Sequence, residues 1–263
     1  MTILDKIIQK KRLEVIALKK TSSIAMLESS VLFHSPVNSL ETALLAKNSS
    51  GIIAEYKRKS PSKGVINGHS SIQEVTEGYL KSGVAAQSIL TDTGFFGGMN
   101  EDLIKARAIN TNVPILRKDF IVDEFQIVES KALGADVILL IAACLTSEEL
   151  KNFGTLAGNL GMSVLYEVHS QEELDKIDLH DKIIGINNRN LKTFEVDLEH
   201  SIQLASQIPE SCLKVSESGI SSPQTILDLK KHGFKGFLIG ENFMKTSHPG
   251  AACQAFIQQI QSV

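Results

Sequence analysis

The sequence predicts an α/β protein built as a single closed (β/α)8 barrel, in which residues 1–50 form an N-terminal helical extension. Eight short apolar runs, often rich in β-branched residues, follow residue 50 and alternate with helical patterns. Their spacing of roughly 20 to 35 residues is that of successive βα units. The length of 263 residues and a hydrophobic content of 43% suit one barrel with a large core, and no flexible linker divides the chain.

The first 50 residues predict two helices, one over residues 2–20 and a second around residues 38–47. The first helix is basic, with lysine or arginine at Lys10, Lys11, Arg12, Lys19 and Lys20. We expect these side chains to form a solvated face, because charge runs on a helix usually meet water.

Eight strands are predicted after this extension, at residues 51–57, 85–91, 113–120, 135–143, 162–169, 182–190, 213–219 and 236–243. Most of these runs are apolar on both faces, which is typical of the parallel sheet that strict β–α alternation produces. An open, doubly wound sheet is the alternative, but no G-x-G-x-x-G turn follows the first strand. The pattern therefore favours a closed TIM barrel.

Helix boundaries lie between these strands, as the barrel requires. Capping boxes are predicted at Ser71–Glu74, Thr146–Glu149 and Ser170–Glu173. Another helix is expected to begin at Ser222-Pro223 and end at Gly233, because proline suits the first helical position and glycine a helix end. Glycine also precedes three strands, at Gly83, Gly134 and Gly161.

Composition and charge exclude several functional classes. A formal net charge of -3 gives no broad basic surface for nucleic acid. The longest apolar run, residues 135–145, is far short of the roughly 20 residues of a membrane span. The N-terminus lacks the pattern of a signal peptide, so we expect a cytoplasmic protein. Neither the 3 cysteines nor the 7 histidines have metal-ligand spacing, and we expect no metal site.

Polar residues gather where the predicted strands end, which is where barrels of this kind hold their active sites. They are Glu55, Lys57 and Ser60 on the first strand, Lys118 on the third, Glu167 on the fifth, Asn187 and Arg189 on the sixth, Glu217, Ser218 and Gly219 on the seventh, and Gly240, Glu241 and Asn242 on the eighth. A network of satisfied ion pairs at the barrel mouth is the alternative interpretation. The number of charges at one rim favours a functional site, because burying charge is costly.

The strand ends also indicate the chemistry of the ligand. Phosphate is often held after the last two strands of such barrels by backbone N–H groups, and here those turns contain Gly219 and Gly240. Glutamate with lysine indicates acid–base chemistry on a carbonyl or enamine, although a Schiff-base lysine would need the same residue types. A lysine can serve as an acid near pH 7 if burial or a neighbouring cation lowers its pKa. Phe96 and Phe120 either pack the fold or line a slot for an aromatic ring.

These motifs resemble the indole-3-glycerol phosphate synthase family of tryptophan biosynthesis. The resemblance is carried by IIAEYKRKSPSKG (52–64), LTDTGFFGG (90–98), PILRKDFIVDEFQI (114–127), LYEVHSQEEL (165–174), IIGINNRNLKTFEVD (183–197), VSESGI (215–220) and GFLIGENFM (236–244). The helical extension is also similar to that of the family. The resemblance implies ring closure of 1-(2-carboxyphenylamino)-1-deoxyribulose 5-phosphate to indole-3-glycerol phosphate, with loss of carbon dioxide and water and without a cofactor.

The same resemblance implies catalytic roles. Lys118 would be the general acid that protonates the carbonyl oxygen, and Lys57 would pair with the anthranilate carboxylate. Glu167 would act in the proton transfers of dehydration. Glu55 would orient Lys118 or share the role of base. Asn187, grouped with the catalytic residues, would bind sugar hydroxyls and the ring face.

Binding roles follow for the remaining residues. The group expected to contact substrate is Ser60, Phe96, Phe120, Arg189, Glu217 and Ser218, of which the two phenylalanines would form the slot for the aromatic ring. The group expected to present N–H groups to the phosphate is Gly219, Gly240 and Glu241. Glu241 fits this role only if its carboxylate points away from the anion.

Two other kinds of barrel remain as alternatives. One is a different sugar-phosphate enzyme, such as phosphoribosylanthranilate isomerase, which needs an early cysteine, or an aldolase, which would form a Schiff base. The other is a barrel that binds phosphorylated metabolites without catalysis. We expect a monomer that acts on a small phosphorylated substrate, with no nucleic-acid or membrane partner. Tyr56 stands where the family usually has an aliphatic residue, and by alternation it should face the outer helices.

Overall fold

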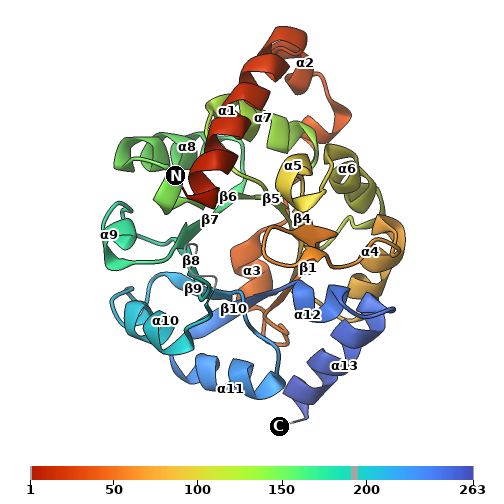
Figure 1. Ribbon diagram of the computed structural model, residues 1–263, viewed down its shortest axis with the longest axis vertical. Coiled ribbons are helices and arrows are strands. Elements are labelled where there is room, and N and C mark those ends of the chain that lie inside the picture. Colours follow the sequence, from red (N-terminus) through yellow and green to blue (C-terminus); the bar gives the residue numbers. More distant parts are fainter. Residues whose placement is uncertain (1, 191–194, 263) are drawn as a thin grey trace.

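Eight parallel strands close into a barrel in the computed structural model, which describes residues 2–190 and 195–262 (Figure 1). In chain order they are β1 (Ile52–Tyr56), β4 (Ala86–Leu90), β5 (Ile115–Lys118), β6 (Val137–Ile141), β7 (Ser163–Val168), β8 (Ile183–Asn187), β9 (Leu213–Glu217) and β10 (Phe234–Ile239). Strand β1 pairs with both β4 and β10, which closes the sheet. The predicted (β/α)8 fold is confirmed.

Helices surround the barrel and connect its strands (Figure 1). The longer ones are α4 (Ile72–Lys81), α6 (Asn100–Ile109), α7 (Glu124–Ala132), α8 (Ser147–Asn159), α10 (Leu198–Ala205), α11 (Pro223–Lys231) and α13 (Pro249–Gln261). The shorter elements are the hairpin β2 (Lys59–Ser60) and β3 (Gly64–Val65), the helices α5 (Thr93–Phe96), α9 (Gln171–Leu174) and α12 (Glu241–Met244), and the 3-10 turn η2 (Ala142–Cys144). None of the helices in the described ranges is long and apolar enough to cross a bilayer.

The predicted helix starts are confirmed, but two of the three predicted capping boxes are incomplete. Ser71 accepts from the N–H of Glu74 without the reciprocal bond. Thr146 forms the full reciprocal box with Glu149. Ser222 caps α11 directly before Pro223. Ser170 accepts from the N–H of Glu173, but the Glu173 carboxylate accepts from the N–H of His169 instead of completing a box. The capping side chain and its partner need only local geometry, whereas the reciprocal bond competes with neighbouring donors.

Two apolar layers hold the barrel together. Inside it, branched side chains such as Leu116, Leu139 and Leu165 pack in one cluster. The outer cluster lies between the strands and helices and contains Tyr56 with Tyr79 of α4. The hydroxyl of Tyr56 donates to the carbonyl of Ser70 at 3.1 Å, so this side chain faces outward as predicted.

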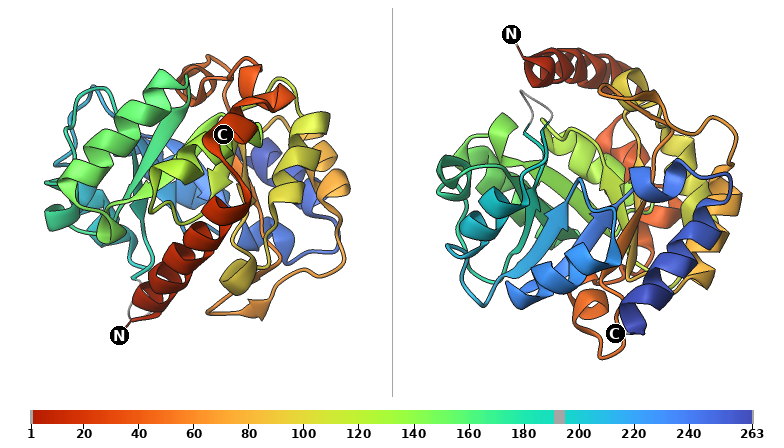
Figure 2. Two further views of the ribbon diagram at one scale, coloured as in Figure 1. Left: turned by 90° about the horizontal axis from the view of Figure 1, so that it is seen from above. Right: turned by 60° about the horizontal axis from the view of Figure 1, so that its bottom comes forward.

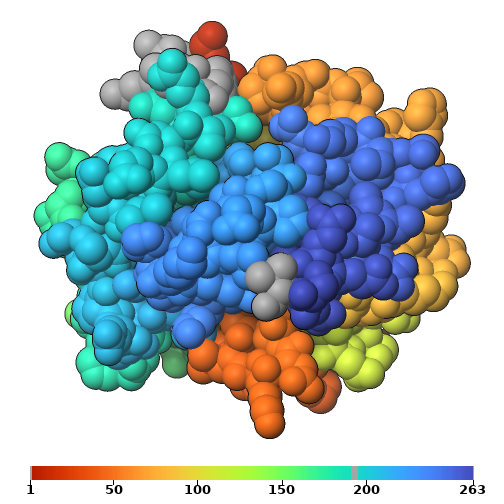
Figure 3. Space-filling view, turned by 90° about the horizontal axis from the view of Figure 1, so that it is seen from below, coloured from red at the N-terminus to blue at the C-terminus, as the bar shows by residue number. Residues whose placement is uncertain are grey.

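The N-terminal extension contacts both ends of the barrel. It consists of α1 (Ile3–Thr21), α2 (Ile24–Glu28), the 3-10 helix η1 (Val31–His34) and α3 (Leu40–Leu45). Helix α1 lies across the end toward which the strands point (Figure 2). The α3 segment lies at the opposite end, as the space-filling view shows (Figure 3), and its Leu40 and Leu44 join the cluster inside the barrel. The N-terminal extension therefore covers the C-terminal end of the barrel with α1 and fills the N-terminal end with α3.

Two sequence predictions about these elements are wrong. Lys11 does not lie on a solvated face, because it is only 6% exposed, whereas Lys10, Arg12, Lys19 and Lys20 are exposed as expected. The eighth strand does not run to residue 243, because it ends at Ile239 and residues 241–244 form α12. Gly240, with φ -120° and ψ -67°, leaves the extended conformation and turns the chain into that helix.

Candidate active site

A cavity of about 380 Å³ opens at the C-terminal ends of the strands, beneath α1. It brings together all the residues that the sequence analysis selected there: Glu55, Lys57, Ser60, Phe96, Lys118, Phe120, Glu167, Asn187, Arg189, Glu217, Ser218, Gly219, Gly240 and Glu241. These residues come from seven of the eight strands or from the segments that follow them. The shared cavity explains why apolar strands end in charged side chains.

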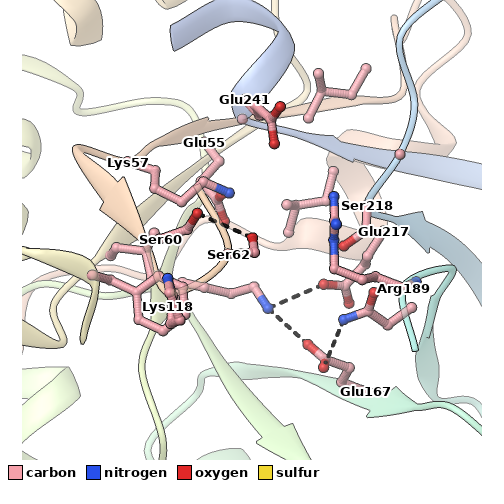
Figure 4. A pocket seen from close by; sticks show the side chains of 18 of the residues that line it. Glu55, Lys57, Ser60, Ser62, Lys118, Glu167, Arg189, Glu217, Ser218 and Glu241 are labelled. Carbon is pink, nitrogen blue, oxygen red and sulfur yellow. Dashed lines mark hydrogen bonds and ion pairs between the residues drawn. The ribbon is translucent and has the colours of Figure 1, made fainter. Parts of the chain in front are cut away.

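Lys118 stands at the centre of the cavity between two carboxylates (Figure 4). Its Nζ is 2.8 Å from Oε2 of Glu167 and 3.2 Å from Oε2 of Glu217. Asn187 Nδ2 donates to the other oxygen of Glu167 at 3.1 Å. Strands β5, β7, β8 and β9 thus each supply one group to a single hydrogen-bonded cluster.

Burial and neighbouring charges give these groups different pKa values. Burial opposes the charge of Lys118, but the carboxylates of Glu167 and Glu217 outweigh it and raise the pKa of the ammonium. Burial also opposes ionisation of Glu167, yet the charges of Lys118 and His169 hold its pKa below the ordinary value. For Glu217, burial is the largest effect and raises the pKa to about 7. The lowered lysine pKa considered from the sequence is therefore absent here, and Lys118 is a fully charged proton donor.

Glu55 and Lys57 form a second pair on the same face of β1, with 2.7 Å between Nζ and Oε1. The sequence suggested that Glu55 orients Lys118, but in this structure Glu167 and Glu217 make the ion pairs to that lysine. Glu55 is 3% exposed and Lys57 lines the same cavity. Lys57 is therefore held by a carboxylate at a position from which it can exchange that partner for an incoming anion.

Glycines make room for the buried carboxylates. A side-chain carbon at Gly185, in the middle of β8, would clash with Oε1 of Glu217. A carbon at Gly240 would lie 2.5 Å from Oε1 of Glu55. From the sequence, Gly240 is expected to bind phosphate and Gly185 carries no prediction, although a glycine inside a strand often marks such a close approach.

The turns after β9 and β10 lie on the side of the cavity opposite Lys118 (Figure 4). Ser218 and Gly219 have φ of 69° and 72°, a left-handed turn that favours glycine at the second position. Lys63 Nζ is 3.8 Å from Oε1 of Glu241, so a cation partly offsets that carboxylate. Residues of both turns line the cavity where a phosphate is predicted.

Apolar groups form the remaining wall. The rings of Phe96 and Phe120 are 5.9 Å apart with an interplanar angle of 36°, and both line the cavity. The cavity is covered from above by Ile3, Leu4 and Ile7 of α1, which are not among the site residues predicted from the sequence. Their spacing of three and four residues marks one apolar helix face, but it does not say which surface that face covers.

His169 lies behind the central cluster. Its Nδ1 is 3.2 Å from Oε2 of Glu173, and its Nε2 is 3.5 Å from Oε1 of Glu167. The ring supports the far side of Glu167, although it is absent from the residues that line the cavity. Among the residues that the structure describes, no cluster of three or more histidine, cysteine or acidic side chains could hold a metal ion.

Comparison with known proteins identifies the family. The family model for indole-3-glycerol phosphate synthase matches residues 4–256. The chain belongs to the indole-3-glycerol phosphate synthase family. It is 48% identical to the indole-3-glycerol phosphate synthase of Bacteroides thetaiotaomicron, over 98% of this chain and 99% of the relative. It is 41% identical to that of Acinetobacter baumannii strain ACICU, over 100% of this chain and 98% of the relative.

Membership of the indole-3-glycerol phosphate synthase family confirms the resemblance predicted from the motifs. A solved structure of the tryptophan synthase a2b2 complex from Pyrococcus furiosus contains a more distant chain with the same fold. That chain has a TM-score of 0.59 and 15% identity, and the match covers 82% of this chain and 99% of that one. At this identity the likeness supports the barrel fold alone.

Proposed function

We propose that this chain converts 1-(2-carboxyphenylamino)-1-deoxyribulose 5-phosphate to indole-3-glycerol phosphate, carbon dioxide and water. The observation that carries the proposal is the charged Lys118 between Glu167 and Glu217, placed in one cavity with an aromatic wall and two glycine turns. A substrate with an aromatic carboxylate at one end and a phosphate at the other needs that combination. The family match supports the same reaction.

The first step joins the ring carbon that bears the carboxylate to C2 of the ribulose. The carbonyl oxygen at C2 gains electron density as this bond forms, and Lys118 gives it a proton to make a hydroxyl group. Because Glu167 and Glu217 hold the ammonium at 2.8 and 3.2 Å, the donor is charged and oriented before substrate arrives. Loss of carbon dioxide then returns the bonding electrons to the ring and restores its aromaticity.

Dehydration completes the pyrrole ring. The new hydroxyl leaves as water after it accepts a second proton, and the former C1 carbon loses a proton to a base. Glu167 suits that role, since its low pKa keeps it ionised and Asn187 holds one of its oxygens at 3.1 Å. The second proton of the departing water comes from solvent, and the proton taken from C1 passes from Glu167 to Lys118, so both groups return to their starting protonation states.

Substrate ends are bound by the flanking groups. Lys57 would exchange Glu55 for the anthranilate carboxylate and hold it against the ribulose carbonyl, which is a proximity effect. Backbone N–H groups of Gly219, Gly240 and Glu241 would contact the phosphate, with Ser60, Ser218 and Arg189 adding polar contacts. Phe96 and Phe120 would enclose the aromatic ring.

The test uses indole fluorescence, to which the protein adds no tryptophan signal because the chain contains 0 tryptophan. Wild-type protein mixed with substrate should produce indole-3-glycerol phosphate without added metal. Lys118→Ala should lower kcat by about 10²- to 10⁴-fold, the usual contribution of a general acid. Lys151→Ala, at an exposed lysine on α8, is the control and should behave like wild type.

The outcomes separate function from mechanism. Product formed at the wild-type rate by Lys118→Ala would contradict the role of the lysine and leave the reaction intact. A folded wild-type protein that forms no product would contradict the proposed reaction itself. We also propose a cytoplasmic monomer, for which light scattering after size exclusion should give one chain mass of 28.7 kDa.

A further inference from the structure

Lys11 is a buried basic residue of α1 whose ammonium meets three carboxylates. Its Nζ lies 3.0 Å from Glu14 on the same helix, 3.0 Å from Asp92 after β4 and 3.0 Å from Asp119 after β5. Asp92 is 1% exposed and Asp119 is 3% exposed. Taking these charges out of water is costly unless they stay paired, so the contact constrains all three segments.

Each aspartate also holds the backbone of one slot phenylalanine. Oδ1 of Asp92 accepts from the N–H of Phe96 at 3.2 Å. Oδ1 of Asp119 accepts from the N–H of Phe120 at 2.7 Å. The ammonium of Lys11 is thus linked to both walls of the Phe96–Phe120 slot, in each case through one aspartate side chain. Helix α1 itself is far from these residues in sequence.

The other contacts around the aspartates do not replace this link. Arg117 lies 3.5 Å from Asp119, and the Thr91 hydroxyl donates to the same carboxylate. Asp92, in contrast, has Lys11 as its ion-pair partner within the described residues. Without the ammonium, two buried carboxylates would repel each other across the base of the slot.

The surroundings give these segments space to separate. A cavity of about 430 Å³ lies beside Lys11 and is lined by Thr91, Arg117 and Asp119 as well. One and two helical turns before Lys11, on the same face of α1, Ile7 and Leu4 cover the substrate cavity. A shift of Asp119 would therefore be transmitted to Phe120 through the hydrogen bond that the N–H of Phe120 donates to it.

We propose that Lys11 is a positioning residue that sets the width of the Phe96–Phe120 slot, and with it the selectivity for the aromatic ring of the substrate. The inference rests on the proposed function for the identity of that ring. Lys11 does not touch the reacting atoms. It acts through Asp92 and Asp119, which fix the two walls of the slot.

The test measures binding of a reduced substrate analogue, in which the ribulose carbonyl is an alcohol and cannot cyclise. The fluorescence of its aminobenzoate group reports binding directly. Lys11→Met keeps the aliphatic stem and removes the charge, and it should raise Kd about tenfold. The variant should also lose most of the discrimination against a ring-methylated analogue, which for one methyl group in a fitted pocket is about 10- to 200-fold.

Three further variants separate slot geometry from helix docking. Lys11→Arg keeps the charge and should restore most of the affinity and selectivity. Asp92→Asn keeps a good helix cap but loses the charge, so it should lose less selectivity than Lys11→Met. It replaces Lys11→Met in the comparison if that variant does not fold. Lys19→Met is the matched control, because Lys19 also anchors α1, at 2.6 Å to Asp123, but forms an ion pair with neither Asp92 nor Asp119.

Equal loss of selectivity in Lys11→Met and Lys19→Met would overturn the proposal, as would unchanged selectivity in Lys11→Met. A wild-type protein that does not bind the aromatic analogue would overturn it too. If the wild type binds the analogue but makes no indole product from substrate, the proposed function fails while the binding comparison still decides the role of Lys11.

Discussion

At the scale of single residues, the site depends on one ammonium shared by two buried carboxylates. Lys118 neutralises one of them, and Glu167 takes the larger share because Asn187 and His169 also favour its charged form. Glu217 is left with burial and a negative neighbour, and its pKa rises to about 7. Two glutamates of the same type therefore titrate differently because their partners differ.

This difference predicts how stability depends on pH. Glu217 keeps its proton in the folded state up to about pH 7, whereas the ordinary pKa of a glutamate, which applies to the unfolded chain, is 4.5. Its stabilising contribution is therefore full below pH 4.5 and is lost as the pH rises through about 7. Glu217→Gln cannot ionise, so from pH 5 to pH 8 it should gain stability relative to wild type, on the order of a few kcal/mol.

Urea unfolding of both proteins at several pH values would measure this difference. The gap in unfolding free energy should change between pH 5 and about pH 7 and then level off. A gap that stays constant over that range would mean that Glu217 is ionised throughout, and the explanation from burial would be wrong. The curves should be compared at equal ionic strength, since exposed charges are screened by salt.

At the scale of elements, α3 closes the end of the barrel opposite the site. Leu40 is 0% exposed and Leu44 is 4% exposed, and both pack with side chains inside the barrel. Leu44 lies against Gly236 near the start of β10, where absence of a side chain leaves room for it. The helix has only six residues, so its stability comes from this packing rather than from helix propensity.

Leu44→Ala should therefore destabilise the fold by about 2–5 kcal/mol, the usual effect of truncating a buried leucine. Thermal or urea unfolding measures the loss. KM for the substrate should stay within about twofold of wild type, because the change is at the far end of the barrel. Leu45→Ala is the control, since Leu45 is 59% exposed and should change stability by no more than about 0.5 kcal/mol. A large KM change in Leu44→Ala would show that the two ends are coupled.

The elements that sequence could predict are those with a local signal. Apolar runs and turn glycines predict the strands, and the C-terminal ends of parallel strands must meet at one rim, so Lys118, Glu167 and Glu217 could be grouped correctly. The predicted end of the last strand is wrong. The short apolar run that includes Phe243 suits a strand as well as the short helix α12 that it forms.

The features that sequence missed depend on contacts between distant segments. Lys11 is buried by Asp92 and Asp119, which lie more than 80 residues away in the chain and give no signal near the helix. Similarly, the apolar face of Ile3 and Ile7 is visible in the sequence, but its position over the cavity follows from how α1 docks. Contacts between segments that are distant in the sequence depend on tertiary structure and not on local propensity.

At the scale of the whole molecule, charge is distributed unevenly. The formal net charge is -3, so the protein as a whole does not attract an anionic substrate. The cavity nevertheless contains Lys57, Lys118, Arg189 and Lys245, and the glutamates there are partly matched by these cations. Attraction of a substrate that is negative at both ends must therefore come from the cavity mouth, within about 10 Å, which is the screening length at 0.1 M salt.

This distribution predicts that KM rises several-fold between about 20 mM and 500 mM NaCl, while kcat changes less, because screening weakens encounter more than proton transfer inside the cavity. Lys245→Ala removes an exposed cation from the mouth, so it should raise KM at low salt and flatten the salt dependence. Lys235→Ala is the matched control, since Lys235 is exposed and lies near the start of β10, at the other end of the strand from Lys245. It should leave the dependence of KM on salt unchanged. Equal slopes in all three proteins would mean that the mouth cations do not attract the substrate, and that its binding depends on the buried groups alone.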